Sequence, residues 1–295
     1  MRLAYLGTPD AAVPPLEAVV SAGHEVVLVV SRPDTRRGRG GAVSASPVKA
    51  AALALGLRVT DDVEAVVSCG AELGVVVAYG RILRPHVLAA VPMVNLHFSL
   101  LPRWRGAAPV ERAILAGDRR TGVCVMDVDE TLDTGAVHAR AEVPIDDRVT
   151  ATELRGELSR LGAELLVDTL AAWPSEGVPQ AVEGVTYAEK LGAGDLALDP
   201  ARPAAELHRV VRVGGARCTF RGRRLKVLDA EPAVAEGTAR VPGTLAPGDA
   251  GVPELAAGDG TVLRLLTVQP EGKAPMPGRD WWNGHRPRAD EVVTP

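Results

Sequence analysis

The first two-thirds of the chain alternates between continuous apolar runs and segments in which apolar residues keep helical spacing. Apolar runs at 2–7, 25–30 and 73–79 are typical of strands buried on both faces of a parallel sheet. Residues 13–20 lie between the first two runs and keep helical spacing, with two prolines in the first turn. This strand-helix-strand order predicts an α/β domain built on an open parallel, Rossmann-like sheet.

Further elements are expected from the same two patterns. They are strands at 93–96, 123–128 and 137–143, and helices at 47–55, 81–90, 111–117 and 150–173. The last helix has the clearest pattern, because Thr150 and Glu153 form a capping-box sequence ahead of a leucine-rich stripe.

The pattern changes after that helix. Residues 174–203 show little periodicity, and a short helix is expected at 203–213. From Arg217 onward, short alternating runs are separated by Gly, Pro and Asp turns, which is typical of a small β-barrel. A length of 295 residues also favours two domains, and we expect them at these bounds: 1–186, a linker at 187–202, and 203–295.

Composition and charge add little for the chain as a whole. Hydrophobic residues make up 46% and charged residues 24%, which is ordinary for a globular protein, and the formal charge is −4. The charge is uneven, however. Residues 201–295 carry 14 Lys and Arg against 11 Asp and Glu, so the acidic excess lies in the first 200 residues.

Cysteine usage and hydropathy suggest the compartment. Cys69, Cys124 and Cys218 are odd in number and far apart, which disfavours a disulfide framework or a zinc site and favours a reducing cytoplasm. No apolar run approaches the ~20 residues of a membrane span, and the chain enters its first strand without a charged and apolar leader. We expect a cytoplasmic protein without a membrane partner.

Candidate chemistry is concentrated around the strand at 93–96. Asn95 and His97 are separated by two positions, so their side chains share one face of the strand. The strand at 123–128 ends in an acidic turn that contains Asp133, and Asp127 and Asp129 are alternatives for its role. An amide, an imidazole and a carboxylate together can supply acid/base catalysis and oxyanion stabilisation.

Other chemistries fit the residues less well. Ser99 has no Gly-x-Ser-x-Gly elbow around it, and no cluster of His, Cys and carboxylates has metal-ligand spacing, so we expect no metal. The first strand ends in Gly7-Thr8-Pro9-Asp10 rather than in the three-glycine fingerprint of dinucleotide-binding domains. A lone histidine in an apolar strand is usually a core residue, but the neighbours of His97 favour a site.

Two cationic segments suggest a polyanion partner. The loop at 32–41 contains four arginines and can be either a solvated surface loop or an arm that contacts phosphates. In the barrel, a second set can be either a charged edge strand or a basic stripe, and it consists of Arg217, Arg221, Arg223, Arg224 and Lys226.

The sequence around the candidate site closely resembles the methionyl-tRNA formyltransferase family. The resemblance rests on Asn95-Leu96-His97-Phe98-Ser99-Leu100-Leu101-Pro102-Arg103-Trp104-Arg105-Gly106, and on Gly7-Thr8-Pro9-Asp10, Leu132-Asp133-Thr134-Gly135 and Tyr187-Ala188-Glu189-Lys190. It spans nearly the whole chain. The amide, imidazole, loop and carboxylate alone mark the wider folate-dependent formyltransferases, whereas the arginine loop and the C-terminal motifs are typical of the tRNA enzymes.

The resemblance implies transfer of a formyl group from 10-formyltetrahydrofolate to the α-amine of methionine on initiator methionyl-tRNA. It implies an OB-like C-terminal barrel that binds tRNA. We expect a monomer, and no metal. The implied roles are as follows: catalytic residues Asn95, His97 and Asp133; folate-binding residues Ser99, Leu100, Leu101 and Pro102; and tRNA-binding residues Arg36, Arg37, Arg39, Lys49, Arg221 and Arg223.

Two segments depart from the family pattern. Thr131 stands where the family often has glycine before Leu-Asp-Thr-Gly, and residues 214–218 replace a stretch that usually contains Pro and Trp. Two alternative functions therefore stay open: formylation of a small amine, such as a nucleotide sugar or a ribonucleotide, and a non-catalytic tRNA-binding module.

Overall fold

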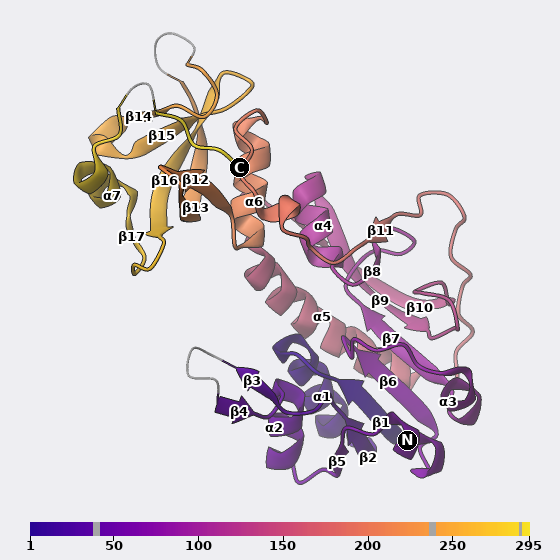
Figure 1. Cartoon of the computed structure of the whole chain (residues 1–295). Helices are drawn as coiled ribbons and strands as arrows, with labels where there is room; N and C mark the ends of the chain where they lie inside the picture. The colour runs from indigo at the N-terminus through magenta and orange to yellow at the C-terminus, as the bar shows by residue number, and fades with distance from the viewer. Residues whose placement is uncertain (38–41, 236–239, 289–290) are drawn as a thin grey trace. The chain divides into compact units, whose positions relative to one another are not determined.

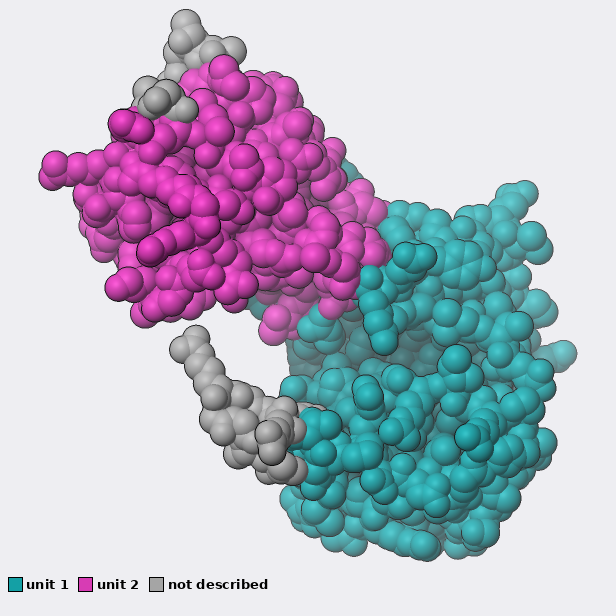
Figure 2. Space-filling view, viewed as in Figure 1, with its two compact units in different colours: residues 1–110, 119–145, 153–190 teal, residues 111–118, 146–152, 191–295 magenta. Residues whose placement is uncertain are grey.

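The computed structural model of the chain describes residues 1–37, 42–235, 240–288 and 291–295. The chain forms two compact units, coloured separately in Figure 2. Unit 1 comprises residues 1–110, 119–145 and 153–190, and unit 2 comprises residues 111–118, 146–152 and 191–295. The chain therefore passes between the units several times rather than at one point. Within the described ranges, no helix is long and apolar enough to cross a membrane.

Unit 1 is built on a seven-stranded sheet with the order β10-β9-β7-β6-β1-β2-β5. Its strands are β1 (Arg2–Gly7), β2 (Glu25–Val30), β5 (Val59–Thr60), β6 (Leu73–Val77), β7 (Met93–His97), β9 (Arg120–Asp127) and β10 (Val137–Pro144). Five neighbouring strands, from β5 to β7, are parallel. Strand β9 runs antiparallel to both β7 and β10, so the sheet is mixed at this edge (Figure 1).

The helices before the barrel agree with the apolar spacing except at one end. They are α1 (Val13–Ser21), α2 (Pro47–Ala54), α3 (Pro85–Ala90), α4 (Pro109–Ala116) and α5 (Ala151–Ala171), with 3-10 turns η1 (Asp10–Ala12) and η2 (Val63–Ser68). The prediction of a helix from Arg81 is wrong, because α3 begins at Pro85. Proline favours the first helical position, and the residue before it, Arg84, is extended as expected.

Strand β1, inside this sheet, is buried after its first residue. Leu3, Tyr5 and Leu6 of β1 have no exposed surface. The Tyr5 hydroxyl donates to the carbonyl of Ala12 at 2.6 Å, which satisfies its polar atom inside the core. Burial raises the pKa of Tyr5 well above its usual value, so the hydroxyl stays a donor.

Unit 2 contains an antiparallel, OB-like sheet with the order β12-β13-β16-β15-β14, and β17 pairs with β16. Its elements are η3 (Gly194–Leu196), α6 (Ala204–Val213), β12 (Arg217–Phe220), β13 (Arg223–Val234), β14 (Leu245–Pro247), η4 (Asp249–Gly251), β15 (Pro253–Ala256), β16 (Thr261–Pro270), β17 (Met276–Pro277) and α7 (Gly278–His285). Trp281 is 1% exposed and joins a core of aliphatic residues from α6 and the strands.

The C-terminal residues contact both ends of this strand order. Thr294 forms a bridge with Thr219 of β12, and Val292 forms one with Thr244, next to β14. Val293 between them is 3% exposed and belongs to the core. The tail therefore pairs with strand edges that would otherwise present unpaired backbone groups to solvent.

Two glycines of α7 provide a test of the barrel packing. A Cβ on Gly278 would lie 1.8 Å from the carbonyl oxygen of Leu265, whereas a Cβ on Gly284 meets nothing within 4 Å. We expect Gly278→Ala to lower the free energy of unfolding by about 1–3 kcal/mol. Gly284→Ala should leave it unchanged or raise it by up to ~1 kcal/mol, since alanine is the better helix former. Thermal unfolding of both variants measures the difference, and equal effects would contradict the close contact at Gly278.

Candidate active site

Strand β7 presents the amide and imidazole at its carboxyl end. It lies between β6 and β9, with Asn95 opposite Val76 on one side and Met126 on the other. Asn95 is half-buried and His97 is 5% exposed. Because they are two positions apart, both side chains are on the same face of the sheet, at the strand end where sites of open α/β sheets are found.

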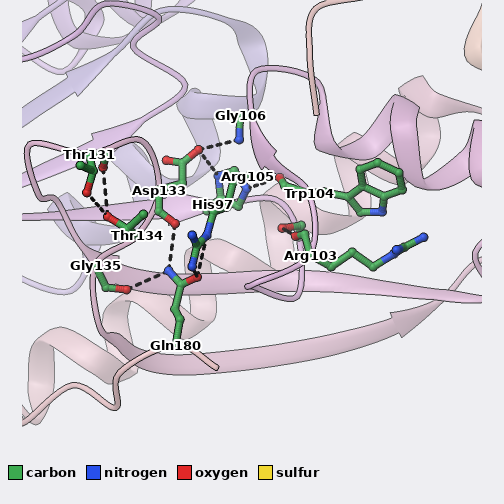
Figure 3. Close-up of polar contacts among 11 residues, drawn as sticks. His97, Arg103, Trp104, Arg105, Gly106, Thr131, Asp133, Thr134, Gly135 and Gln180 are labelled. Carbon is green, nitrogen blue, oxygen red and sulfur yellow. Dashed lines mark hydrogen bonds and ion pairs between the residues drawn. The ribbon is translucent and has the colours of Figure 1, made fainter. Parts of the chain in front are cut away.

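The ring of His97 is oriented by a backbone carbonyl. Its Nε2 donates to the carbonyl oxygen of Trp104 at 2.9 Å (Figure 3). A carbonyl can only accept, so Nε2 must carry a proton. The other ring nitrogen, Nδ1, faces Asp133.

Asp133 is the carboxylate that the structure places beside this ring. Its Oδ2 is 3.7 Å from Nδ1 of His97, an ion-pair distance when the ring is protonated, and it accepts a 2.7 Å hydrogen bond from the backbone N–H of Gly106. The two alternatives lie elsewhere: Asp127 accepts a 2.8 Å bond from Nε2 of His138, and Asp129 is exposed.

The Ser-Leu-Leu-Pro loop after β7 is fixed by buried side chains. Ser99 has no exposed surface, and its hydroxyl donates to the carbonyl of Arg103 at 2.6 Å. Leu101 is 2% exposed and belongs to a cluster with residues of β9 and β10. Leu100 and Pro102 are only partly buried. Of the four predicted folate residues, these last two therefore offer side-chain surface, while Ser99 and Leu101 shape the loop.

A pair of very short strands positions the donor to Asp133. Strand β8 (Arg105–Gly106) pairs in parallel with β11 (Tyr187–Ala188), which falls in the segment expected to be a linker. Gly106 has a φ of +123°, and a Cβ there would lie 2.8 Å from the carbonyl oxygen of Ala188. Glycine is therefore required where the backbone N–H points at the carboxylate.

Sequence reasoning missed three residues that support the site. Gln180 donates to the backbone carbonyls of the Asp133 turn, and the Thr186 hydroxyl accepts from the backbone N–H of Trp104 at 2.9 Å. His138 has a side chain only 3% exposed, and it binds Asp127 at the base of the turn. No local pattern marks any of them, because their partners are distant in sequence or follow from strand register.

The cationic residues differ in their partners. Arg36 and Arg37 lie on β3 (Thr35–Arg37), which pairs with β4 (Ala42–Ser44), and Arg39 lies outside the described residues. Lys49 forms a 2.8 Å ion pair with Asp34, and its backbone N–H is capped by Ser46 at the start of α2.

In the barrel, Arg223 is exposed on β13, whereas Arg221 is engaged. Arg221 donates twice to Glu291, at 2.7 Å each, and its guanidinium lies 4.9 Å from the ring centre of Phe220. The side-chain hydrogen bond from Arg221, with backbone help from Arg288, lowers the pKa of Glu291 to about 2, so this carboxylate stays charged at ordinary pH.

The structure explains locally how the chain accommodates its two departures from the family pattern, Thr131 and residues 214–218. The hydroxyls of Thr131 and Thr134 hydrogen-bond to each other across the turn before Gly135. Gly214 and Gly215 have φ values of +94° and +80°, and Gly214 ends α6. Glycines suit this abrupt change of direction into β12. Among the residues that the structure describes, no group of three His, Cys, Asp or Glu side chains could hold a metal ion.

Comparison with known proteins defines the class. Residues 1–170 match the Formyl transferase family, and residues 190–286 match the family described as Formyl transferase, C-terminal domain. The chain therefore belongs to the formyltransferase family. This confirms the predicted fold class, an N-terminal Rossmann-like formyltransferase sheet with a C-terminal OB-like domain.

Two relatives that match along nearly the whole chain have the same name. A methionyl-tRNA formyltransferase from Symbiobacterium thermophilum is 44% identical and covers 96% of this chain and 92% of its own length. Another from Roseobacter denitrificans is 45% identical and covers 96% of both chains.

Solved structures share the fold at low identity. An N-formyltransferase from Helicobacter canadensis, in complex with folinic acid and dTDP-3-aminofucose, aligns with a TM-score of 0.68 at 16% identity over 89% of this chain and 98% of that one. HypX from Aquifex aeolicus, in complex with tetrahydrofolic acid, aligns with a TM-score of 0.65 at 15% identity over 96% of this chain and 47% of that one.

The bond to the Trp104 carbonyl predicts a single neutral tautomer for His97. We expect a pyrrole-type nitrogen at Nε2 and a pyridine-type nitrogen at Nδ1 when the ring is neutral. Long-range proton–nitrogen spectra of histidine-labelled protein measure this, with His97→Asn to assign the signals. A neutral ring protonated at Nδ1 would show that the carbonyl does not hold the imidazole.

Proposed function

We propose that this protein transfers the formyl group of 10-formyltetrahydrofolate to the α-amine of methionine on initiator methionyl-tRNA, in the cytoplasm. The observation that carries the proposal is the coincidence of two findings. Relatives named methionyl-tRNA formyltransferase match the chain over nearly its full length. The motif shared with that family brings Asp133 to His97 at the end of β7, where Asn95 shares the face of the strand.

The reaction asks for charge stabilisation and for movement of one proton. The neutral amine attacks the formyl carbon, a carbon–nitrogen bond forms, and the carbonyl oxygen becomes negative. Asn95 can donate its amide N–H to that oxygen, and one such donor contributes roughly 3 kcal/mol in acyl-transfer sites. Collapse breaks the bond to N10 of the folate, which takes up the proton lost by the amine.

His97 and Asp133 are suited to carrying that proton. Because Nε2 is held by the Trp104 carbonyl, Nδ1 is the ring nitrogen able to accept and return a proton. The Asp133 carboxylate, 3.7 Å away, can stabilise positive charge on the ring when it carries the proton. No covalent enzyme intermediate is needed.

Folate binding is assigned to the loop of residues 99–102. Its shape is set by the buried hydroxyl of Ser99 and by Leu101, which leaves the partly buried Leu100 and Pro102 and the loop backbone to contact the ligand. The fold neighbour bound to tetrahydrofolic acid supports a folate substrate for this fold.

The tRNA contacts are assigned to the two cationic segments. In the barrel, Arg217 lies opposite Lys226, and Arg224 lies opposite Thr219, on the outward face of β12 and β13. Like charges opposite each other destabilise a sheet, so a binding role for this face accounts for them better than stability does. Arg223 is also exposed, but it lies opposite Phe220 at the start of β13 and so belongs to the other face, and Arg221 must exchange Glu291 for a phosphate. Near the acceptor end we assign the remaining predicted residues, Arg36, Arg37, Arg39 and Lys49.

A small amine as acceptor is the second candidate function. It is favoured by one observation, the fold shared with the Helicobacter canadensis protein solved with dTDP-3-aminofucose, but only at 16% identity. The near full-length relatives at 44–45% identity favour the tRNA substrate. A non-catalytic tRNA-binding module is disfavoured by the assembled site.

Formylation of charged initiator tRNA tests the proposed function. We expect turnover by the wild type, and a loss of at least ~100-fold in kcat for His97→Ala, since general acid–base catalysis is typically worth that much. The matched control is His86→Ala, an exposed histidine that pairs with Glu64. A wild type that formylates an amino sugar but leaves the tRNA unmodified would support the small-amine alternative.

The barrel assignment predicts a salt-dependent binding defect. We expect Arg224→Gln to raise KM for the tRNA several-fold, to leave kcat nearly unchanged, and to lower the slope of log affinity against log salt by ~1. Arg279→Gln serves as the control, because Arg279 is another exposed barrel arginine and lies next to Asp280. Equal effects of the two substitutions would mean that overall charge, rather than the β13 face, governs binding.

A further inference from the structure

One side-chain amide holds the turn that carries Asp133. The Nε2 of Gln180 donates to the backbone carbonyls of Asp133 and Gly135, both at 2.9 Å (Figure 3). Gln180 lies 47 and 45 residues further along the chain. The shape of the turn therefore depends on a residue that is remote in sequence.

Arg105 fixes the orientation of that amide. Its Nε and one terminal nitrogen both donate to Oε1 of Gln180, at 3.0 and 2.7 Å. A guanidinium only donates and a backbone carbonyl only accepts. Gln180 can thus satisfy both partners in one orientation alone, with its oxygen toward Arg105 and its nitrogen toward the turn.

The residues on either side of Arg105 contact the two catalytic groups. The carbonyl of Trp104 accepts from His97, and the N–H of Gly106 donates to the Asp133 carboxylate. Three consecutive residues therefore contact the imidazole, the amide that supports the turn, and the carboxylate. Displacement of the turn relative to this tripeptide would change the distance between the carboxylate and the ring.

The turn needs such support. Asp133 has a φ of +52°, in the left-handed region that residues with a side chain adopt infrequently. Such a conformation persists only where its surroundings hold it. The two bonds from Gln180 are made to the carbonyl of Asp133 itself and to that of Gly135, so they act where the backbone is strained.

We propose that Arg105 and Gln180 form a positioning pair, which sets the Asp133 carboxylate against His97 for catalysis. The proposal rests on the proposed formyl transfer and deepens it. Neither residue contacts the reacting atoms in this assignment. Both act through Asp133, so their substitution should lower turnover rather than substrate binding.

The test is a set of variants in which the amide of Gln180 or the guanidinium of Arg105 is replaced by the unbranched apolar side chain of methionine. We expect Gln180→Met and Arg105→Met each to lower kcat for methionyl-tRNA formylation by about 10–100-fold, since small misplacements of catalytic groups have effects of this order. KM for both substrates should change by less than about twofold and Tm by less than ~3 °C. In an Asp133→Asn background, Gln180→Met should cause almost no further loss, because the two changes remove one function.

The matched control is Gln269→Met. Gln269 donates its Nε2 to a backbone carbonyl, that of Lys273, at 3.0 Å in the other unit, and should tolerate the change. The proposal would be overturned if Gln180→Met had the kcat of the wild type. It would also be overturned if Gln180→Met lowered kcat as strongly in the Asp133→Asn background as in the wild type, or if a lowered Tm accounted for the loss of kcat.

Failure of the proposed function would be recognised separately, as a wild type that does not formylate methionyl-tRNA. The positioning pair is then judged by the ring nitrogen signals of His97. Their chemical shifts should change in Gln180→Met and remain those of the wild type in Gln269→Met. Unmoved signals in Gln180→Met would overturn the proposal.

Discussion

The hydrogen bond from the Gly106 N–H to the Asp133 carboxylate is the contact on which the site depends. It is charge-assisted, 2.7 Å long, and joins the loop after β7 to the turn between β9 and β10. It is available only because β8 brings the backbone against β11, so closely that a Cβ on Gly106 would meet the Ala188 carbonyl at 2.8 Å. Gly106, which has no side chain that could take part in catalysis, thereby determines where the carboxylate lies.

The placement of Asn95 and His97 followed from the sequence because strand periodicity is a local property. Two positions on one strand share a face whatever the rest of the fold does. The sequence favoured Asp133 over Asp127 and Asp129, but strand periodicity could not establish that choice. All three are near the strand end, and the conformation of the turn decides which carboxylate reaches the ring. That conformation depends on Gln180, whose contribution comes from long-range contacts that no periodicity encodes.

The sequence predicted which segments form the strands of the sheet better than it predicted the direction of each strand. Continuous apolar runs indicated the parallel strands β1, β2 and β6, but an apolar run does not show the direction of a strand, and β9 is antiparallel to β7. The segment after α5 has no apolar periodicity and was expected to be linker from Tyr187 onward. Its backbone nevertheless pairs with β8, and Thr186 supports Trp104. Irregular segments bind through backbone and polar groups, which hydrophobic patterns do not report.

The modest charge of the C-terminal region is explained by where its carboxylates lie. Glu254 is 6% exposed and is paired with Arg240 and Arg264, and Arg264 also contacts Asp249. These acids neutralise arginines inside their own networks and contribute little field at a distance. The cross-strand neighbours of Lys226 are Arg217 on β12 and Gln269 on β16, and neither is acidic. Surface charges are screened within ~10 Å at ordinary ionic strength. A phosphate backbone therefore responds to the local electrostatic potential of the surface rather than to the net charge of the whole region. A nearly balanced barrel can therefore present a cationic face.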